Sequence, residues 1–452
     1  MPDGAGAGAK EAPEDAPPDP EQEVAPSTAV GSSRPRLLGV LGPGLISGAS
    51  DDDPVAIGTY SQAGAGFGYA LCWLPLLCWP LMVAVQEISG RIGRTTGRGL
   101  AGAIDRHYPP WLLRGCVALI LVANTVAVGA DLGAMGDALH LLVGGPRLLY
   151  VVLFGALCVG MQVFLRYTRY VAILKWTTLS LLAYFAAAAL AGVSWGEVAR
   201  ALLPSLSADP DWITAVVAIF GVALSPYLLF WQSAQEVEDQ RVLPNREPLL
   251  KAPEQAPAAL KRIELDTAVG MGVAVLVGLA IMVTTAATLH AGGATEIQSS
   301  AQAAEALRPA AGPFAFVLFA LGIIGTGLLA VPVLAGSAAY AIGEARHWPV
   351  GLSREPREAK AFYGTLAAAA AIGTALNLTG IDPIRALYWS AVVNGVVAAP
   401  LLALTVLVAS RRDVMGAFAI GPALRAVGWT TVALLGASAC AMGFLAFWGG
   451  PS

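Results

Sequence analysis

The apolar positions of this chain fall into long, nearly uncharged stretches that are separated by polar connections. A stretch of about 20 apolar residues is long enough to cross the hydrocarbon core of a membrane as a helix. Eleven such stretches are present, at 38–64, 68–90, 112–142, 148–166, 170–192, 212–235, 266–290, 312–342, 361–378, 385–409 and 427–448. The pattern therefore predicts an all-α polytopic membrane protein with 11 transmembrane helices.

The remaining segments are polar and differ in character. Residues 1–36 are rich in Ala, Pro, Gly and Glu and contain no apolar run. Such a composition predicts a disordered tail and not a signal peptide. Residues 37–452 are predicted to form one transmembrane domain. The connection 236–264 is charged and rich in proline, so it is predicted to be a surface loop that begins at a solvated helix end containing Glu236.

The composition agrees with this class of protein. Hydrophobic residues make up 56% of the chain and charged residues 13%, whereas soluble proteins carry roughly 25% charged residues. An ordinary soluble enzyme is therefore excluded. The formal net charge of −4 offers no basic surplus for binding nucleic acid.

The distribution of Lys and Arg predicts the orientation in the membrane. With a cytoplasmic N-terminus and eleven spans, 23 of the 27 basic residues fall on the cytoplasmic side. The four on the other side are Arg147, Arg200, Arg308 and Arg385. Because cytoplasmic loops are enriched in Lys and Arg, the N-terminus is predicted to be cytoplasmic and the C-terminus outside. Trp111 and other tryptophans near span ends fit an interfacial belt.

Three carboxylates interrupt the first predicted span. Asp51, Asp52 and Asp53 stand in its middle and Pro54 follows them. Each carboxylate at membrane depth costs at least about 2.5 kcal/mol. Proline removes a backbone donor and disfavours helix at the preceding residue. The helix is therefore predicted to unwind here, inside the protein or beside a cavity. The alternative is that 38–50 is a surface segment and the Asp run is a helix cap at the interface.

The sixth predicted span is also interrupted by a proline, within Ser225-Pro226-Tyr227. A central proline alone can simply kink a helix. Interrupted spans at corresponding places in two halves, however, are typical of a transporter with inverted repeats. The repeats are predicted at about 38–192 and 212–409, with an extra helix at about 427–448. Unwound carbonyls beside Asp carboxylates suit a hard divalent cation.

At these residues the chain resembles the Nramp family of divalent-metal transporters. The family's first helix carries a DPGN motif and then a QAGA-like stretch, and this chain has DPVA at 53–56 and QAGA at 62–65. Further matching segments are GPG at 42–44, QEISGRIG at 86–93 and ADLG at 130–133. The resemblance covers the first ten spans. It implies a LeuT-like fold of two inverted five-helix repeats, with helices 1 and 6 broken, that moves metal by alternating access.

The chain departs from the family pattern at four positions. Ser225 replaces the methionine of the MPH motif, Tyr227 replaces its histidine, Ala56 replaces the DPGN asparagine, and Ala134 replaces an acidic residue linked to proton transfer. This set resembles the Nramp-related magnesium transporter branch. An all-oxygen site selects hard ions, and Mg²⁺ usually keeps several waters.

The predicted metal site contains six residues. Asp53 is the leading candidate for a direct or water-mediated ligand, and Asp52 and Asp51 are weaker candidates. The resemblance adds Val222, through its backbone carbonyl, and Asn394, through a polar amide on the tenth helix. Ser225 offers a hydroxyl or a carbonyl. The alternatives are simple packing for Ser225 and an interhelical hydrogen bond for Asn394.

Two further polar residues lie within predicted spans. Tyr227 is predicted to be a structural hydrogen-bonding residue beside the unwound turn. Asp131, in the third span, is predicted to be a polar residue on a path through the protein or half of an ion pair with Arg94 or Arg98.

The predicted function is a secondary transporter of divalent metal cations, with Mg²⁺ as substrate and Mn²⁺ as a second one, without proton coupling. The composition and short loops suggest a bacterial plasma membrane. The metal is then a substrate, and no prosthetic group, nucleic-acid partner or obligate protein partner is inferred. No enzyme is expected, because the sequence contains no H-E-x-x-H motif. The alternatives are a proton-coupled Mn²⁺/Fe²⁺ Nramp transporter and an organic-solute symporter of the same fold.

Overall fold

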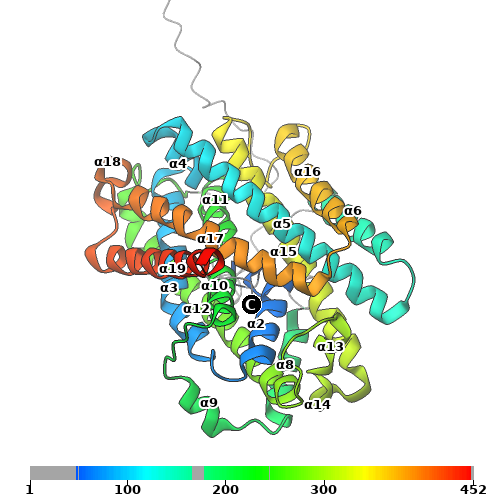
Figure 1. The fold of residues 1–452 in the computed structure, drawn as a ribbon. Helices are drawn as coiled ribbons and strands as arrows, with labels where there is room; N and C mark the ends of the chain where they lie inside the picture. The colour runs from blue at the N-terminus through cyan, green and yellow to red at the C-terminus, as the bar shows by residue number, and fades with distance from the viewer. Residues whose placement is uncertain (1–46, 49, 165–177, 244, 449–452) are drawn as a thin grey trace, which may run out of the picture.

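The computed structural model describes residues 47, 48, 50–164, 178–243 and 245–448, which form a bundle of helices without a β-strand (Figure 1). The predicted tail at 1–36 lies outside these residues. The long helices are α3 (Trp73–Thr96), α5 (Pro110–Val143), α6 (Arg147–Phe164), α12 (Ala256–Thr285), α15 (Ala315–Ala345), α16 (Lys360–Leu376), α17 (Pro383–Ser410) and α19 (Pro422–Trp448). The all-helical prediction is confirmed.

The first and sixth predicted spans are each divided into two helical pieces. In the first, Asp51 is helical, Asp52 and Asp53 form a bend, and α2 (Pro54–Phe67) begins at the proline. In the sixth, α10 (Pro210–Ala223) and α11 (Pro226–Val242) are separated by two residues. Both predicted breaks are therefore confirmed. Figure 1 shows α2 and α10 near the centre of the bundle.

The predicted number of spans is not confirmed. Eight helices in the described residues are long and apolar enough to cross a membrane, or nine if α8 (Leu182–Leu190) and α9 (Trp195–Ala201), bent by 119°, form one span. The first span is not counted because its described helix α2 has only 14 residues. The helix α3 is also not counted, and Pro80 and the polar pair Gln86–Glu87 lower its apolar character.

The predicted surface loop at 236–264 is wrong in extent. The helix α11 continues to Val242 and α12 starts at Ala256, so both helices enter the predicted loop. Glu236 is fully buried and accepts an ion-pair contact from Arg262, with 2.5 Å between Oε2 and Nη2. Charged residues in the sequence predict solvent exposure, but here two residues of opposite charge pair with each other inside the protein.

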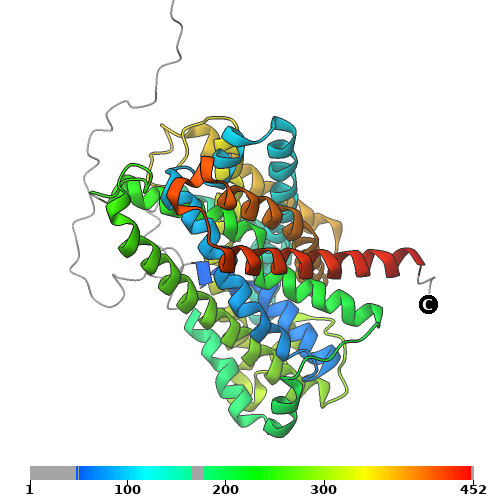
Figure 2. The same cartoon turned by 90° about the vertical axis from the view of Figure 1, so that its left-hand side faces the viewer.

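Short helices occur in connections for which no helix was predicted. They are α4 (Leu100–His107), α9, α13 (Ser300–Glu305), α14 (Arg308–Ala311) and α18 (Arg412–Met415). On α3, Glu87 and Arg91 stand one helical turn apart and form an ion pair. In Figure 2, α19 runs along one side of the bundle, and only 11% of its most apolar window is buried.

The helices α10 and α17 cross at two glycines. A Cβ atom added at Gly221 would lie 1.9 Å from the carbonyl oxygen of Ala391, and one added at Gly395 would lie 2.4 Å from that of Val217. Small residues permit such close backbone approach in membrane helices. The crossing therefore fixes α17 against the half-helix that leads to the second break.

Replacing Gly221 with alanine is expected to destabilise the protein, because the new methyl group overlaps the α17 backbone. Overpacking of this kind costs about 1–3 kcal/mol. The measurement is the thermal unfolding midpoint of the purified protein in detergent. Gly436→Ala is the matched control, since a Cβ there would meet no neighbouring element among the described residues within 4 Å. Equal midpoints for the two variants would contradict the close crossing.

Candidate metal site

The first break buries its three carboxylates. The exposed fractions of Asp51, Asp52 and Asp53 are 4%, 6% and 5%. Asp53 is the N-cap of α2, and its Oδ1 accepts a 2.7 Å hydrogen bond from the backbone N–H of Ala56. A helix N-terminus favours negative charge through its free N–H groups. The Asp run thus does include a helix cap, as the alternative interpretation held, but the cap lies inside the protein and not at a surface.

The second break has its own internal hydrogen bonds. Ser225 Oγ contacts the carbonyl oxygens of Val222 at 2.6 Å and of Gly221 at 3.0 Å. In a helix, the Val222 carbonyl would accept from the residue four positions later, which is Pro226 and has no N–H. The Ser225 hydroxyl supplies the missing donor. The Ser225 carbonyl accepts the backbone N–H of Leu228 at 3.2 Å, so the remaining lone pairs of its carbonyl and hydroxyl oxygens are what Ser225 offers to a ligand.

A tyrosine from the second break stabilises the first. Tyr227 donates its hydroxyl hydrogen to the carbonyl oxygen of Ser50 at 2.9 Å, and both residues are buried. Ser50 stands four residues before Pro54, so its carbonyl also lacks the helical donor. The predicted structural role of Tyr227 is confirmed, and this contact brings the two breaks together.

Asn394 lies beside the crossing of α10 and α17. It shares a face of α17 with Leu387 and Ala391, and these two residues meet Gly58 of α2 and Gly221 of α10. The exposed fraction of Asn394 is 3%, and its Oδ1 accepts no hydrogen bond from any described residue. The amide oxygen is therefore a buried acceptor with unused capacity. An interhelical hydrogen bond to that oxygen, the alternative interpretation, is not seen among the described residues.

Asp131 on α5 is fully buried and approaches the backbone N–H of Val55 in α2, although neither carboxyl oxygen makes a hydrogen bond of good geometry within the described residues. Its charge interacts with that of Asp53. The predicted ion pair with Arg94 or Arg98 is wrong. Arg94 donates to Gln255 Oε1 at 2.6 Å and to the Glu247 carbonyl, and Arg98 is exposed. Asp131 thus lies beside the first break without a cationic partner in the described chain.

The six candidate residues therefore belong to two adjoining breaks and the helix that crosses one of them. No group of three His, Cys, Asp or Glu side chains in the described residues is arranged to hold a metal ion. Any metal held here would need oxygen atoms of several kinds, from carboxylates, carbonyls, the amide and water. Binding by these six residues remains a prediction.

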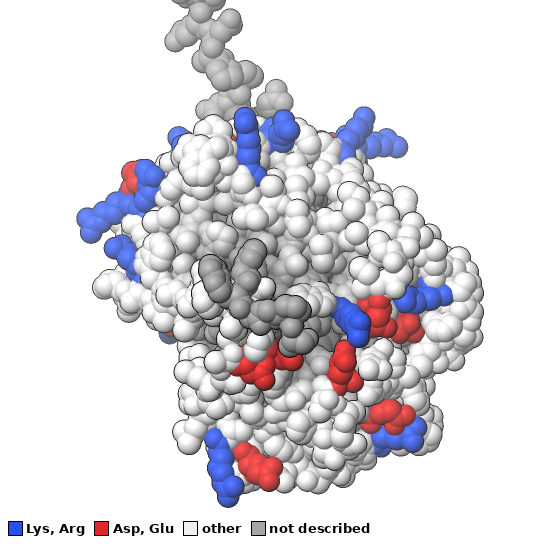
Figure 3. Space-filling model, in the orientation of Figure 1, with Lys and Arg blue, Asp and Glu red and all other residues white. Residues whose placement is uncertain are grey.

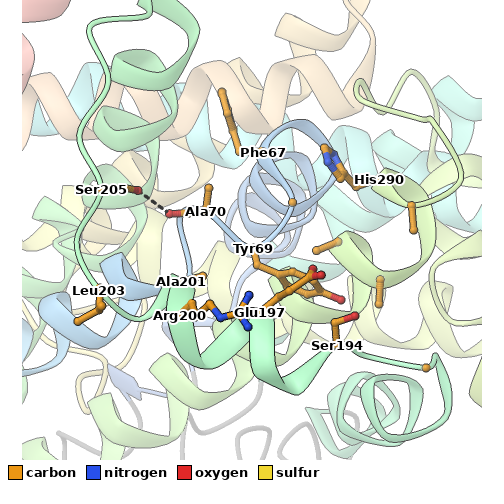
Figure 4. Close-up of a pocket in the computed structure, with 15 residues that line it drawn as sticks. Phe67, Tyr69, Ala70, Ser194, Glu197, Arg200, Ala201, Leu203, Ser205 and His290 are labelled. Atoms are coloured by element: carbon orange, nitrogen blue, oxygen red, sulfur yellow. Dashed lines mark hydrogen bonds between the residues drawn. The ribbon is translucent and has the colours of Figure 1, made fainter.

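A separate cavity of about 620 Å³ lies at the C-terminal end of α2 (Figure 4). It is lined by Phe67, Tyr69 and His290, together with Glu197 and Arg200 of α9. His290 Nδ1 lies 2.7 Å from the carbonyl oxygen of Ala65. None of the six candidates lines this cavity, so it does not expose the predicted site.

The fold is that of membrane transporters with broken helices. A manganese transporter of Eremococcus coleocola, solved in complex with an aromatic bis-isothiourea substituted compound, superposes with a TM-score of 0.75 at 17% identity, covering 94% of this chain and 92% of that one. Mhp1, a nucleobase-cation-symport-1 family transporter solved with bromovinylhydantoin bound, matches with a TM-score of 0.50 at 15% identity, covering 90% and 91%.

The family model described as natural resistance-associated macrophage protein-like, or Nramp, matches residues 44–445, and the chain belongs to this family. The divalent metal cation transporter MntH of Deinococcus radiodurans is 28% identical over 445 residues, covering 94% of this chain and 95% of that protein. MntH of Acidiphilium cryptum is 29% identical over 409 residues, covering 87% and 88%. The predicted family is confirmed, while its magnesium branch stays a prediction.

Tyr227→Phe is expected to lower the free energy of unfolding by about 1–3 kcal/mol, because the buried Ser50 carbonyl loses its donor. Thermal unfolding of the purified protein measures the effect. Tyr388→Phe is the control, since the Tyr388 hydroxyl makes no hydrogen bond within the described residues. If Tyr227→Phe unfolds at the same temperature as the unmodified protein, the hydroxyl does not stabilise the first break.

Proposed function

We propose that this chain is a secondary transporter that moves divalent metal cations across a bacterial plasma membrane by alternating access. Mg²⁺ is the main substrate, Mn²⁺ is a second one, and transport is not coupled to protons. The main support is that every candidate metal ligand, at the two breaks and on α17, offers an oxygen atom. These residues are Asp51–Asp53, Val222, Ser225 and Asn394. Oxygen ligands favour hard cations such as Mg²⁺.

The charge of the first break also favours a divalent cation. Three adjacent carboxylates, with Asp131 nearby, repel one another and lose hydration when buried. The described residues next to them supply no Arg or Lys partner. A bound divalent cation would offset both costs. An anionic organic solute would increase the repulsion, so this charge disfavours the organic-solute symporter.

Few protein ligands are expected to touch the ion directly. The described residues provide no ready cluster of three acidic, histidine or cysteine side chains. Mg²⁺ dehydrates reluctantly and is typically held by one or two carboxylates while it keeps several waters. A partly hydrated ion held by Asp53, with help from Asp52 and nearby oxygens, fits this arrangement.

One sulfur atom does pack near the first break. A Cβ atom added at Gly327 of α15 would lie 2.5 Å from Sδ of Met135 and 3.3 Å from Cγ of Pro54. Met135 of α5 is thus buried and packs against Gly327 of α15. The position at which the family places its methionine is Ser225, whose hydroxyl faces its own helix.

The absence of proton coupling is proposed from the histidines and Tyr227. The chain has four histidines, at 107, 140, 290 and 347, and each lies at or just beyond a helix end. At Tyr227, where the family places a histidine, the hydroxyl donates to the Ser50 carbonyl and also contacts Asp53. The buried and unpaired Asp131 favours the second candidate function, a proton-coupled Mn²⁺/Fe²⁺ transporter, because such a carboxyl can take up a proton.

The relatives support the proposal that the chain transports divalent metal cations in a bacterium. The curated proteins that match over nearly the whole chain are bacterial and carry the name divalent metal cation transporter. An N-terminus in the cytoplasm and a C-terminus outside are proposed from the distribution of Lys and Arg. No catalytic role is proposed.

Proteoliposomes that contain the protein, a Mg²⁺-sensitive dye and a pH dye test the proposal. We expect Mg²⁺ entry without acidification of the lumen. Asp53→Ala is expected to abolish entry, because it removes the N-cap carboxylate at the first break. Asp413→Ala is the matched control, since its side chain is exposed and pairs with Arg411 far from the breaks.

Two outcomes would contradict the proposal. Entry of Mn²⁺ with protons, and no entry of Mg²⁺, would establish the proton-coupled alternative. Undiminished Mg²⁺ entry in Asp53→Ala would show that the metal site does not lie at the first break. Circular dichroism of each variant shows whether a loss of transport reflects a loss of fold.

Ser225→Met is expected to shift selectivity toward Mn²⁺, because a thioether is a softer ligand than a hydroxyl. Competition between Mn²⁺ and Mg²⁺ uptake measures the shift, and we expect a change of about tenfold in the ratio, which corresponds to about 1.4 kcal/mol. Met135→Leu is the control, since it removes the nearby sulfur and keeps the volume. A shift in the control, and none in Ser225→Met, would mean that Met135 contacts the ion.

A further inference from the structure

A groove opens between α5 and α15, away from the candidate metal site. It encloses about 440 Å³, and its lining includes Asp105, Leu113, Arg114, Val117, Ile342 and Arg346. One end is charged and the other is apolar. Nothing in the transport proposal uses these residues.

The charged end presents two arginines. Arg114 and Arg346 are exposed and form no ion pair with any described residue. The acidic residue at this end, Asp105, is occupied by His347, with 3.0 Å between Oδ2 and Nε2. The two guanidinium groups therefore have no anionic partner from the described protein, and their chemistry suits a phosphate.

The apolar end follows one face of α5. Leu113, Val117 and Leu121 recur every four residues, so they form a continuous stripe along the helix axis. Ile342 of α15 lines the groove opposite this stripe. The groove therefore has aliphatic side chains along its length and two arginines at one end. A phospholipid has the same arrangement, with an acyl chain next to a charged headgroup.

The position of the groove fits a membrane boundary. The spanning helix α5 starts at Pro110, so Arg114 lies about one turn from its end. Trp111 is 70% exposed at the same end, as expected for an interfacial tryptophan. Figure 3 shows Lys and Arg along the upper edge of the molecule, where Figure 1 places α4 and the start of α5.

We propose that this groove binds one anionic phospholipid from the surrounding bilayer. Arg114 and Arg346 bind the phosphate of the headgroup. One acyl chain lies between the α5 stripe and Ile342. Since α4, α5 and α15 meet at this groove, a bound lipid joins them at their ends. This inference does not depend on which cation the protein moves.

Native mass spectrometry of the purified protein, titrated with phosphatidylglycerol and with phosphatidylcholine, tests the proposal. We expect one tightly bound phosphatidylglycerol. The double variant Arg114→Gln/Arg346→Gln should bind it about 30-fold more weakly, from the loss of two cationic contacts. The control Arg98→Gln/Arg106→Gln removes two exposed arginines that do not line the groove and should bind as the unmodified protein does.

A second pair of variants tests the acyl chain. Ala118→Trp fills the apolar part of the groove and should also prevent tight binding, whereas Leu119→Trp points a similar ring out of the lining and should not. Inorganic phosphate added in excess should not displace the lipid, because the acyl chain also contributes to binding. Retained binding in the arginine or Ala118 variants, equal binding of phosphatidylcholine, or full competition by phosphate would each overturn the proposal.

Discussion

Two prolines and the carbonyls they leave without donors determine the centre of this protein. Pro54 and Pro226 each lack the backbone N–H that, in an unbroken helix, the carbonyls of Ser50 and Val222 respectively would accept. A carbonyl without a donor is costly in a membrane interior. Both are satisfied by residues of the segment Ser225–Tyr227. One short segment therefore stabilises both breaks, and the buried carboxylates, the crossing with α17 and the candidate donors are arranged around it.

The sequence predicted those features whose cause is local. Proline and a run of three aspartates disrupt a helix wherever they stand in an apolar span, so both breaks were predicted at the correct residues. Long-range partners were not predictable in this way. Tyr227 was expected to form a structural hydrogen bond, but its acceptor lies 177 positions away. The chain has 51 glycines, and nothing in the sequence marks Gly221 and Gly395 as the crossing point.

The errors share one physical origin. A charged residue near the end of an apolar stretch has the same signature whether water or an opposite charge satisfies it. The sequence therefore predicts a solvated helix end at Glu236 and offers Arg94 as a partner for Asp131, and both predictions are wrong. In the folded chain, Glu236 pairs with Arg262, and Arg94 binds the connection between α11 and α12. Pairing of this kind depends on which helices become neighbours, which composition does not encode.

The ion pair between Glu236 and Arg262 has a mechanical consequence. Glu236 has no exposed surface, so parting the two side chains would leave a carboxylate in the interior without its counter-charge. Breaking a buried pair by removing one partner costs several kcal/mol, roughly 3–5. Sliding α11 past α12 at this level is therefore far less favourable than moving them together. The two helices otherwise pack mainly against other elements, above all α3, so this one ion pair is a direct tie between the half-helix after the second break and the long helix that follows it.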